Sequence, residues 1–190
     1  MKIVCLGDSL TAGYNIRPQD CWVSLLNDEG SCEWINRGIC GDTTAGMLVR
    51  LERDVLAESP EMVLIMGGDN DILISAQSMT ARANIMAMVQ HCVHSGIKPV
   101  IGIPYEIRFL SPEWLAAAGD DIDALHRESA AFIAWLRSYV KAFSLRHVDF
   151  DAAFSESKRT GLIQPDGLHP TVAGNERMAE AVRTALLRRH

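Results

Sequence analysis

Short apolar runs alternate with amphipathic segments along almost the whole chain. Five brief runs of apolar, often β-branched residues predict buried strands at 2–6, 33–36, 62–66, 98–103 and 146–150. Apolar residues recur at helical spacing between and after these runs, which predicts helices near 22–30, 44–57, 79–95, 120–145 and 171–188. Strands that alternate with helices in this way predict an α/β fold, with a parallel sheet covered by helices.

The segments that follow the predicted strands carry most of the candidate chemistry. Ligands of open α/β sheets bind outside the carboxyl ends of the strands. The segments at these ends read, in chain order, GDSLTAG, RGICGDTT, GGDNDIL, PYEIRFLSPEWLAAAG and, beyond a short connector, QPDGLHP. Four of the five offer groups suited to acyl transfer, so we expect one site that is assembled from several loops.

Ser9, in GDSLTAG, is the candidate nucleophile. Alone, this serine fits a turn or a helix N-cap as well as a catalytic group. A serine hydroxyl also needs a base that takes its proton. Asp166 and His169 lie three residues apart across a turn, so the carboxylate can bond to one imidazole nitrogen while the other faces Ser9. The remaining histidines fall on predicted helices or at the start of a strand.

Three groups are candidates for stabilising an oxyanion. They are the backbone N–H groups of Ser9 and Gly41 and the side-chain amide of Asn70. Loss of one such donor typically costs about 2.7–4 kcal/mol of transition-state stabilisation. A tight turn explains Gly41 equally well, and an Asx-turn explains Asn70. The acids beside these donors are interpreted as loop braces that accept backbone N–H bonds, namely Asp8, Asp42 and Asp71.

Composition narrows the class of protein. With 190 residues, of which 48% are hydrophobic, the chain fits a single domain spanning 1–190. A net charge of −6 argues against a nucleic-acid partner or an anionic membrane surface. The first apolar run is too short for a signal segment or a membrane span, so we expect no stable membrane insertion and a cytoplasmic location, although a trimmed secreted form would look the same.

Five cysteines occur at irregular spacing, without a C-x-x-C pair. Their odd number and spacing favour reduced, mostly buried thiols over a disulfide framework or a zinc site. The sequence sets no oligomeric state.

Four short blocks together resemble the SGNH hydrolases, also called the GDSL family of esterases and lipases. The blocks are GDSL at Ser9, GD at Gly41, GDND at Asn70 and DGLH at Asp166 to His169. The resemblance implies a flavodoxin-like three-layer α/β/α sandwich with a nucleophilic Ser9, a general base His169 and an orienting Asp166. It also implies that Ser9, Gly41 and Asn70 form the oxyanion hole. The order and flanking residues are similar to those of small thioesterases and lysophospholipases.

One departure from the family pattern concerns Asp69. Many members have two glycines directly before Asn-Asp, whereas here Asp69 intervenes in GGDND. Its carboxylate would oppose developing negative charge unless the side chain points away from the oxyanion site.

The longest of these loops, 104–119, carries several aromatic residues. Tyr105, Phe109 and Trp114 are candidates for an apolar wall or lid that shapes the substrate pocket. Alternatively, the loop is a surface excursion whose aromatic rings fold back onto the sheet.

The leading hypothesis is a serine ester hydrolase that acts on a small ester or thioester through an acyl-enzyme, and needs no metal or organic cofactor. A carbohydrate O-deacetylase would use the same machinery. A non-catalytic module that holds a phosphate at GDSLTAG is a second class. A metal-dependent phosphatase that uses Asp8, Asp69, Asp71 and His169 is a third.

Overall fold

Five parallel strands form the centre of the structure, a computed structural model that describes residues 1–27, 30, 32–119, 121–155 and 160–187. The strands are β1 (Lys2–Gly7), β2 (Glu33–Gly38), β3 (Met62–Met66), β4 (Lys98–Ile103) and β5 (Arg146–Asp149). They are ordered β2-β1-β3-β4-β5, as in flavodoxin-like folds. The predicted α/β fold is therefore confirmed, and each predicted strand lies within two residues of its expected bounds.

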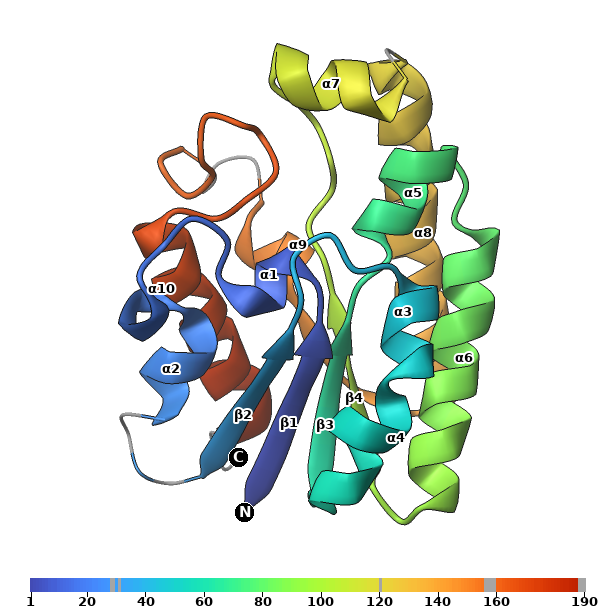
Figure 1. Ribbon diagram of the computed structural model, residues 1–190, viewed down its shortest axis with the longest axis vertical. Helices are drawn as coiled ribbons and strands as arrows, with labels where there is room; N and C mark the ends of the chain where they lie inside the picture. The colour runs from blue at the N-terminus through green and yellow to red at the C-terminus, as the bar shows by residue number, and fades with distance from the viewer. Residues whose placement is uncertain (28–29, 31, 120, 156–159, 188–190) are drawn as a thin grey trace.

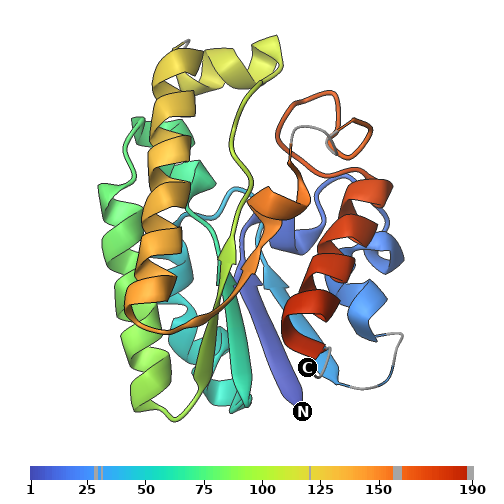
Figure 2. The same ribbon diagram turned by 180° about the vertical axis from the view of Figure 1, so that it is seen from behind.

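Helices cover both faces of the sheet (Figures 1 and 2). One face carries α3 (Thr44–Val49), α4 (Leu51–Asp54), α6 (Met79–His94) and α8 (Ile122–Ala142). The other face carries α2 (Trp22–Asn27) and α10 (Val172–Val182). Because successive strand residues point to opposite faces, a strand covered on both sides must be apolar throughout.

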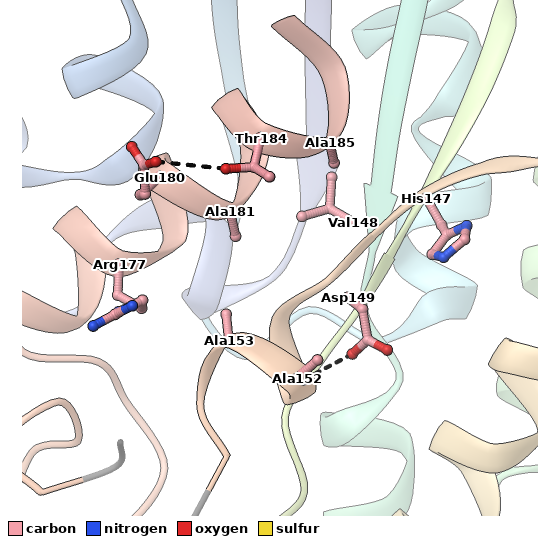
Figure 3. Close-up of a pocket in the computed structure, with 10 residues that line it drawn as sticks. All are labelled: His147, Val148, Asp149, Ala152, Ala153, Arg177, Glu180, Ala181, Thr184 and Ala185. Atoms are coloured by element: carbon pink, nitrogen blue, oxygen red, sulfur yellow. Dashed lines mark hydrogen bonds between the residues drawn. The ribbon is translucent and has the colours of Figure 1, made fainter. Parts of the chain in front are cut away.

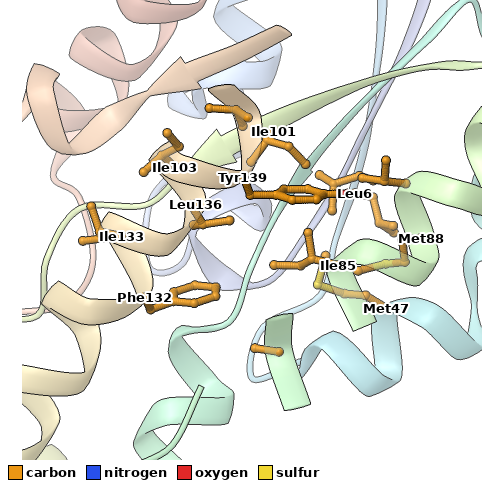
Figure 4. Close-up of a cluster of buried hydrophobic side chains, with 14 of the residues drawn as sticks. Leu6, Met47, Ile85, Met88, Ile101, Ile103, Phe132, Ile133, Leu136 and Tyr139 are labelled. Atoms are coloured by element: carbon orange, nitrogen blue, oxygen red, sulfur yellow. The ribbon is translucent and has the colours of Figure 1, made fainter. Parts of the chain in front are cut away.

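Two hydrophobic clusters follow from this alternation. In β1, Val4 and Leu6 pack with the α6 and α8 side, whereas Ile3 and Cys5 pack with the α2 and α10 side. Figure 4 shows the first cluster, in which Phe132, Leu136 and other α8 side chains lie against strand and α6 residues. The sheet is thus held between two apolar layers that fix the positions of the strand ends.

Within the described residues, four short α-helices were not among those predicted. They are α1 (Ser9–Ala12), α5 (Asp69–Ser75), α7 (Pro112–Ala118) and α9 (Phe150–Ala153). Each spans at most seven residues, so no long apolar periodicity marks it, although Pro112 at the first turn of α7 is a helix-start signal. The helix predicted near 44–57 is broken at Arg50, whose ψ of 2° leaves the helical range, and ends in a 3₁₀ turn at Leu56–Glu58.

Two details of the predicted helices differ. Phe143 was expected on the buried stripe of the long helix, but it lies just beyond α8 and is 56% exposed. After α10 the chain continues as a π-helical turn, Arg183–Leu187. The predicted polar terminus at 188–190 lies outside the described residues.

All five cysteines are free thiols. Cys5, Cys21 and Cys92 are buried, Cys32 is half-buried, and Cys40 is exposed.

Candidate active site

Ser9 lies two residues after the end of β1, at the first position of α1. The preceding Asp8 is the N-cap of this helix, and its Oδ1 accepts a hydrogen bond from the Leu10 backbone N–H at 2.9 Å. Ser9 is therefore free of the capping role that its sequence context allowed. Its hydroxyl is 2.9 Å from Nε2 of His169, a distance typical of a hydrogen bond.

Asp166 and His169 form the second half of this hydrogen-bonded chain. Nδ1 of His169 is 2.6 Å from Oδ2 of Asp166, while Oδ1 accepts the backbone N–H groups of Leu168 and His169. A carboxylate at Nδ1 favours the tautomer with the proton on that nitrogen, which leaves Nε2 as an acceptor for the Ser9 hydroxyl. Ser9 is at least 157 residues from the other two residues in the sequence. In the fold, the three side chains are nevertheless aligned for proton transfer.

The electrostatics of this pair favour a neutral imidazole. Burial lowers the pKa of His169 below its ordinary value, and the hydrogen bond and charge of Asp166 only partly offset that effect. At Asp166, burial acts to raise the pKa, but the hydrogen bonds from His169 and Leu168 outweigh it and lower the pKa. His169 can therefore act as a base near neutral pH, beside an ionised Asp166.

Contacts with distant segments hold the loop that carries His169. Gln164 donates from Nε2 to the carbonyls of Tyr14 at 3.1 Å and Pro170 at 2.9 Å, so it ties the segment after Ser9 to the histidine loop. Gly167, with φ of +81°, faces the Phe109 backbone, where a Cβ would be 2.3 Å from the carbonyl oxygen. These contacts restrict the position of the imidazole relative to the Ser9 hydroxyl.

The three candidate oxyanion donors come from adjacent strands. Ser9 follows β1, which lies between β2 and β3 in the sheet, and Gly41 and Asn70 follow these two neighbouring strands. Gly41 is exposed, has φ of +77°, and has no atom within 4 Å of the position where a Cβ would stand. Asn70 donates from Nδ2 to the Asp42 carbonyl at 2.9 Å, which links its side chain to the loop that contains Gly41.

Asp69 does not reach solvent beside these donors. Its side chain is 4% exposed, and both oxygens are buried without a hydrogen-bond partner among the described residues. Burial first, and then the charges of Asp8 and Asp71, raise its pKa well above the ordinary value. Burial also raises the pKa of Asp8 to about 7. The carboxyl group that interrupts the family pattern is thus enclosed and held toward its neutral form.

The other acids and threonines act within the loops. Asp71 accepts the backbone N–H and the hydroxyl of Thr44 at 2.9 and 2.7 Å. Thr43 caps α3 with its hydroxyl, which accepts a hydrogen bond from the N–H of Gly46. Asp42 instead pairs with the Arg50 guanidinium at 2.7 Å.

Two aromatic rings flank His169. The ring centroid of Tyr14 lies 4.1 Å from that of the imidazole, and the centroid of Trp114 lies 5.8 Å from it. Trp114 was a predicted substrate residue, whereas Tyr14 was missed because nothing in its local pattern indicates where its ring points. Phe109, also predicted, is 58% exposed.

Tyr105 has a different place from the one expected. Its side chain is 2% exposed, its ring stacks on Phe154 at 4.6 Å, and its hydroxyl donates to the Leu168 carbonyl at 2.6 Å. Tyr105 therefore supports the loop of His169 from inside the protein, and a substrate cannot reach it. Tyr105 therefore follows the alternative interpretation of this loop, in which the aromatic rings fold back onto the sheet.

A cavity of about 460 Å³ lies elsewhere, between β5, α9 and α10 (Figure 3). Its lining includes His147, Asp149 and Arg177 but none of the candidate catalytic residues. In the part of the chain that the structure describes, no three His, Cys, Asp or Glu side chains are grouped to hold a metal ion. Asp8, Asp69, Asp71 and His169 therefore do not form a ligand set. Over the same residues, every helix is too short or too polar to cross a bilayer.

Comparison with known proteins places this chain in a family. Residues 5–177 match the model of the GDSL-like Lipase/Acylhydrolase family, so the chain belongs to this family of esterase-type hydrolases. Esterase TesA of Pseudomonas aeruginosa is 30% identical over 186 residues, which cover 95% of this chain and 85% of TesA.

Two further likenesses are informative. Thioesterase 1/protease 1/lysophospholipase L1 of Escherichia coli K12 is 31% identical over 101 residues, which cover 52% of this chain and 49% of that protein. The solved structure of a putative lipolytic protein of the G-D-S-L family from Desulfitobacterium hafniense superposes with a TM-score of 0.81 at 25% identity. That match covers 97% of this chain and 99% of the other.

Proposed function

We propose that this chain hydrolyses a carboxylic ester or thioester through an acyl-enzyme on Ser9. The observation that carries the proposal is the continuous hydrogen-bonded chain from Ser9 Oγ to His169 Nε2 and from His169 Nδ1 to Asp166. A phosphate-binding loop needs neither the histidine nor the aspartate, so the complete set favours catalysis over a binding module.

In the acylation step, Nε2 of His169 takes the Ser9 proton while Oγ attacks the carbonyl carbon of the substrate. The resulting tetrahedral oxyanion accepts hydrogen bonds from the N–H groups of Ser9 and Gly41 and from the Asn70 amide. The imidazolium then gives its proton to the leaving alcohol or thiol, and the carbon–oxygen or carbon–sulfur bond breaks. Asp166 stabilises the imidazolium and keeps the ring in the required tautomer.

In the deacylation step, His169 takes a proton from water, and the hydroxide attacks the acyl carbon on Ser9. Collapse of the second tetrahedral intermediate releases the carboxylic acid and returns the proton to Ser9. Apart from the substrate and this water, every group that these steps use comes from the chain itself.

In this proposal the substrate surface is formed by Tyr14 and Trp114, whose rings both lie near the His169 imidazole, together with Phe109 from the same loop as Trp114. Their rings suit an apolar acyl or alcohol group next to the reacting ester. We propose a water-soluble or monomeric ester as substrate, since a net charge of −6 disfavours binding to an anionic lipid surface.

A panel of p-nitrophenyl esters from acetate to decanoate, with acyl thioesters and acetylated sugars alongside, tests this proposal. We expect hydrolysis of p-nitrophenyl esters, with kcat reduced at least about 10³-fold in Ser9→Ala. The matched control Ser95→Ala, an exposed serine just beyond α6, should keep the wild-type rate. Turnover of acetylated sugars alone would favour the O-deacetylase instead, and equal rates in wild type and Ser9→Ala would contradict the proposal.

A further inference from the structure

Arg50 is a buried cation that binds four acceptors from different segments. Its residue exposure is only 7%, and it interrupts the helical segment between α3 and α4. Its acceptors are the Asp42 carboxylate at 2.7 Å, the Asp54 carboxylate at 2.9 Å, and the carbonyls of Gly7 and Arg37 at 2.8 Å. A buried charge is tolerated only when it is fully paired, and the planar guanidinium fork suits such fixed geometry.

Two of these acceptors lie beside the candidate oxyanion donors. The Gly7 carbonyl, which also accepts the N–H of Ile39, is two residues before Ser9. Asp42 directly follows Gly41, and its carbonyl accepts the Asn70 amide. One guanidinium thus connects the ends of β1 and β2 directly, and the segment after β3 through Asp42. Figure 1 shows the segment between β2 and α3 passing over the carboxyl ends of the neighbouring strands.

Gly46 in α3 provides the space for the Asp42 carboxylate. A Cβ at this glycine would be 1.9 Å from Oδ1 of Asp42, so any other residue displaces that carboxylate. Glycine inside a helix normally costs about 0.5–1 kcal/mol relative to alanine. The glycine is therefore explained by the position of Asp42 rather than by helix stability.

We propose that Arg50, acting through Asp42 and Gly7, is a positioning residue that fixes the oxyanion hole. The inference rests on the proposed function. Arg50 touches no reacting atom; it sets where the Gly41 N–H and the Asn70 amide point. These donors bind the oxyanion more strongly than the ground-state carbonyl, so their displacement lowers kcat more than it raises KM. A misplacement of about 1 Å can cost about 10²-fold in rate.

Three variants loosen this connection at different points, namely Asp42→Asn, Gly46→Ala and Arg50→Lys. We expect kcat for p-nitrophenyl acetate to fall about 10- to 100-fold in Asp42→Asn and Gly46→Ala, with KM changed less than about 3-fold. Arg50→Lys keeps the positive charge, so its kcat should fall less than that of Arg50→Met. The control Arg53→Met removes an exposed arginine that also pairs with Asp54 but does not reach the loops, and should keep wild-type kcat.

A transition-state analogue separates positioning from general support of the fold. Phenylboronic acid forms a tetrahedral adduct with a nucleophilic serine, so its affinity should fall in parallel with kcat in the Asp42 and Gly46 variants. The acid limb of the pH profile should not move, because His169 and Asp166 are untouched. If Arg50 acts through Asp42, the two substitutions are not independent. The fold-loss of kcat in the double variant Arg50→Lys/Asp42→Asn should then be smaller than the product of the fold-losses in the two single variants.

Rates are normalised to the folded fraction measured by far-UV circular dichroism, so a variant that folds poorly still gives a result. The role of Arg50 would be overturned if kcat fell only in proportion to the folded fraction. It would also be overturned if Asp42→Asn bound phenylboronic acid as tightly as the wild type does. Failure of the proposed function gives a different result, because the wild-type protein itself would then neither hydrolyse the ester nor bind the boronic acid at Ser9.

Discussion

The Ser9 hydroxyl bonds to His169 because the residue before it, Asp8, caps helix α1. Had Ser9 capped the helix, its oxygen would face backbone N–H groups and would be a poor nucleophile. His169 in turn is enclosed at 2% exposure and is oriented by Asp166. At the scale of single residues, the proposed chemistry therefore depends on which neighbour takes each hydrogen bond.

The pH dependence of hydrolysis should report the state of His169. Burial lowers its pKa, so kcat/KM for p-nitrophenyl acetate should rise to a plateau with an acid-limb midpoint below the ordinary histidine value of about 6.5. Asp166 raises the pKa of His169, so Asp166→Asn should move the midpoint to still lower pH and reduce the plateau. A midpoint above 6.5 in the wild type would contradict this description of the site.

Replacement of Asp69 by asparagine should stabilise the protein increasingly as pH rises. The folded-state pKa of Asp69 is raised, so the native protein keeps a proton that the unfolded chain loses above its ordinary pKa near 3.8. The contribution of Asp69 to the stability of the wild type is therefore fully present below that pH and declines as pH rises toward the folded-state pKa. The amide side chain of the variant is neutral and does not titrate, so this decline is absent from it.

Thermal unfolding between about pH 5 and pH 9 measures this difference. The difference in unfolding temperature between Asp69→Asn and the wild type should grow with pH. The control Asp123→Asn, at an exposed position on α8, should show no such growth. A constant or shrinking advantage would show that Asp69 is not held toward its neutral form.

At the scale of elements, the site depends on loops that are tied to one another. The segment after α1 and the loop before α10 are separated by about 150 residues, yet Gln164 bonds to Tyr14 in the first and to Pro170 in the second. The Tyr105 hydroxyl adds a bond to the same loop from beneath. These contacts restrict the distance between the Ser9 hydroxyl and the His169 imidazole.

Gln164→Ala should therefore lower kcat about 10-fold with little change in KM, which is less than the loss for a displacement of about 1 Å. The control Gln90→Ala removes an exposed glutamine on α6. Steady-state kinetics with p-nitrophenyl acetate should show the lower kcat in Gln164→Ala and the wild-type kcat in Gln90→Ala. Wild-type kcat in Gln164→Ala would mean that other contacts alone hold the loops together.

Strands and long helices could be predicted from the sequence because burial on one or two faces imposes a period on the residues. The strand 62–66 is apolar throughout and was placed with its bounds correct. Short helices such as α5 and α7 were not predicted, since seven residues are too few to show a helical period and neither helix has a side-chain N-cap. The ring of Tyr14 and the amide of Gln164 were missed for a related reason, because side-chain directions within loops are set by distant segments.

At the scale of the whole molecule, the parallel sheet converts distant sequence blocks into neighbours. Alternating helices and strands predicted that the carboxyl ends would share one edge, and the order β2-β1-β3-β4-β5 places Ser9 between the segments of Gly41 and Asn70. That order could not be read from the hydrophobic pattern alone. The apolar layers on both faces keep these strand ends in register, so that a site built from loops can be rigid.

The most direct test of the account is covalent labelling of the folded protein with a fluorophosphonate, followed by digestion and mass spectrometry. We predict one label per chain on the peptide that contains Ser9, no label in Ser9→Ala, and much slower labelling in His169→Ala. An unlabelled Ser9 peptide in correctly folded wild-type protein would contradict the claim that Ser9 is the nucleophile.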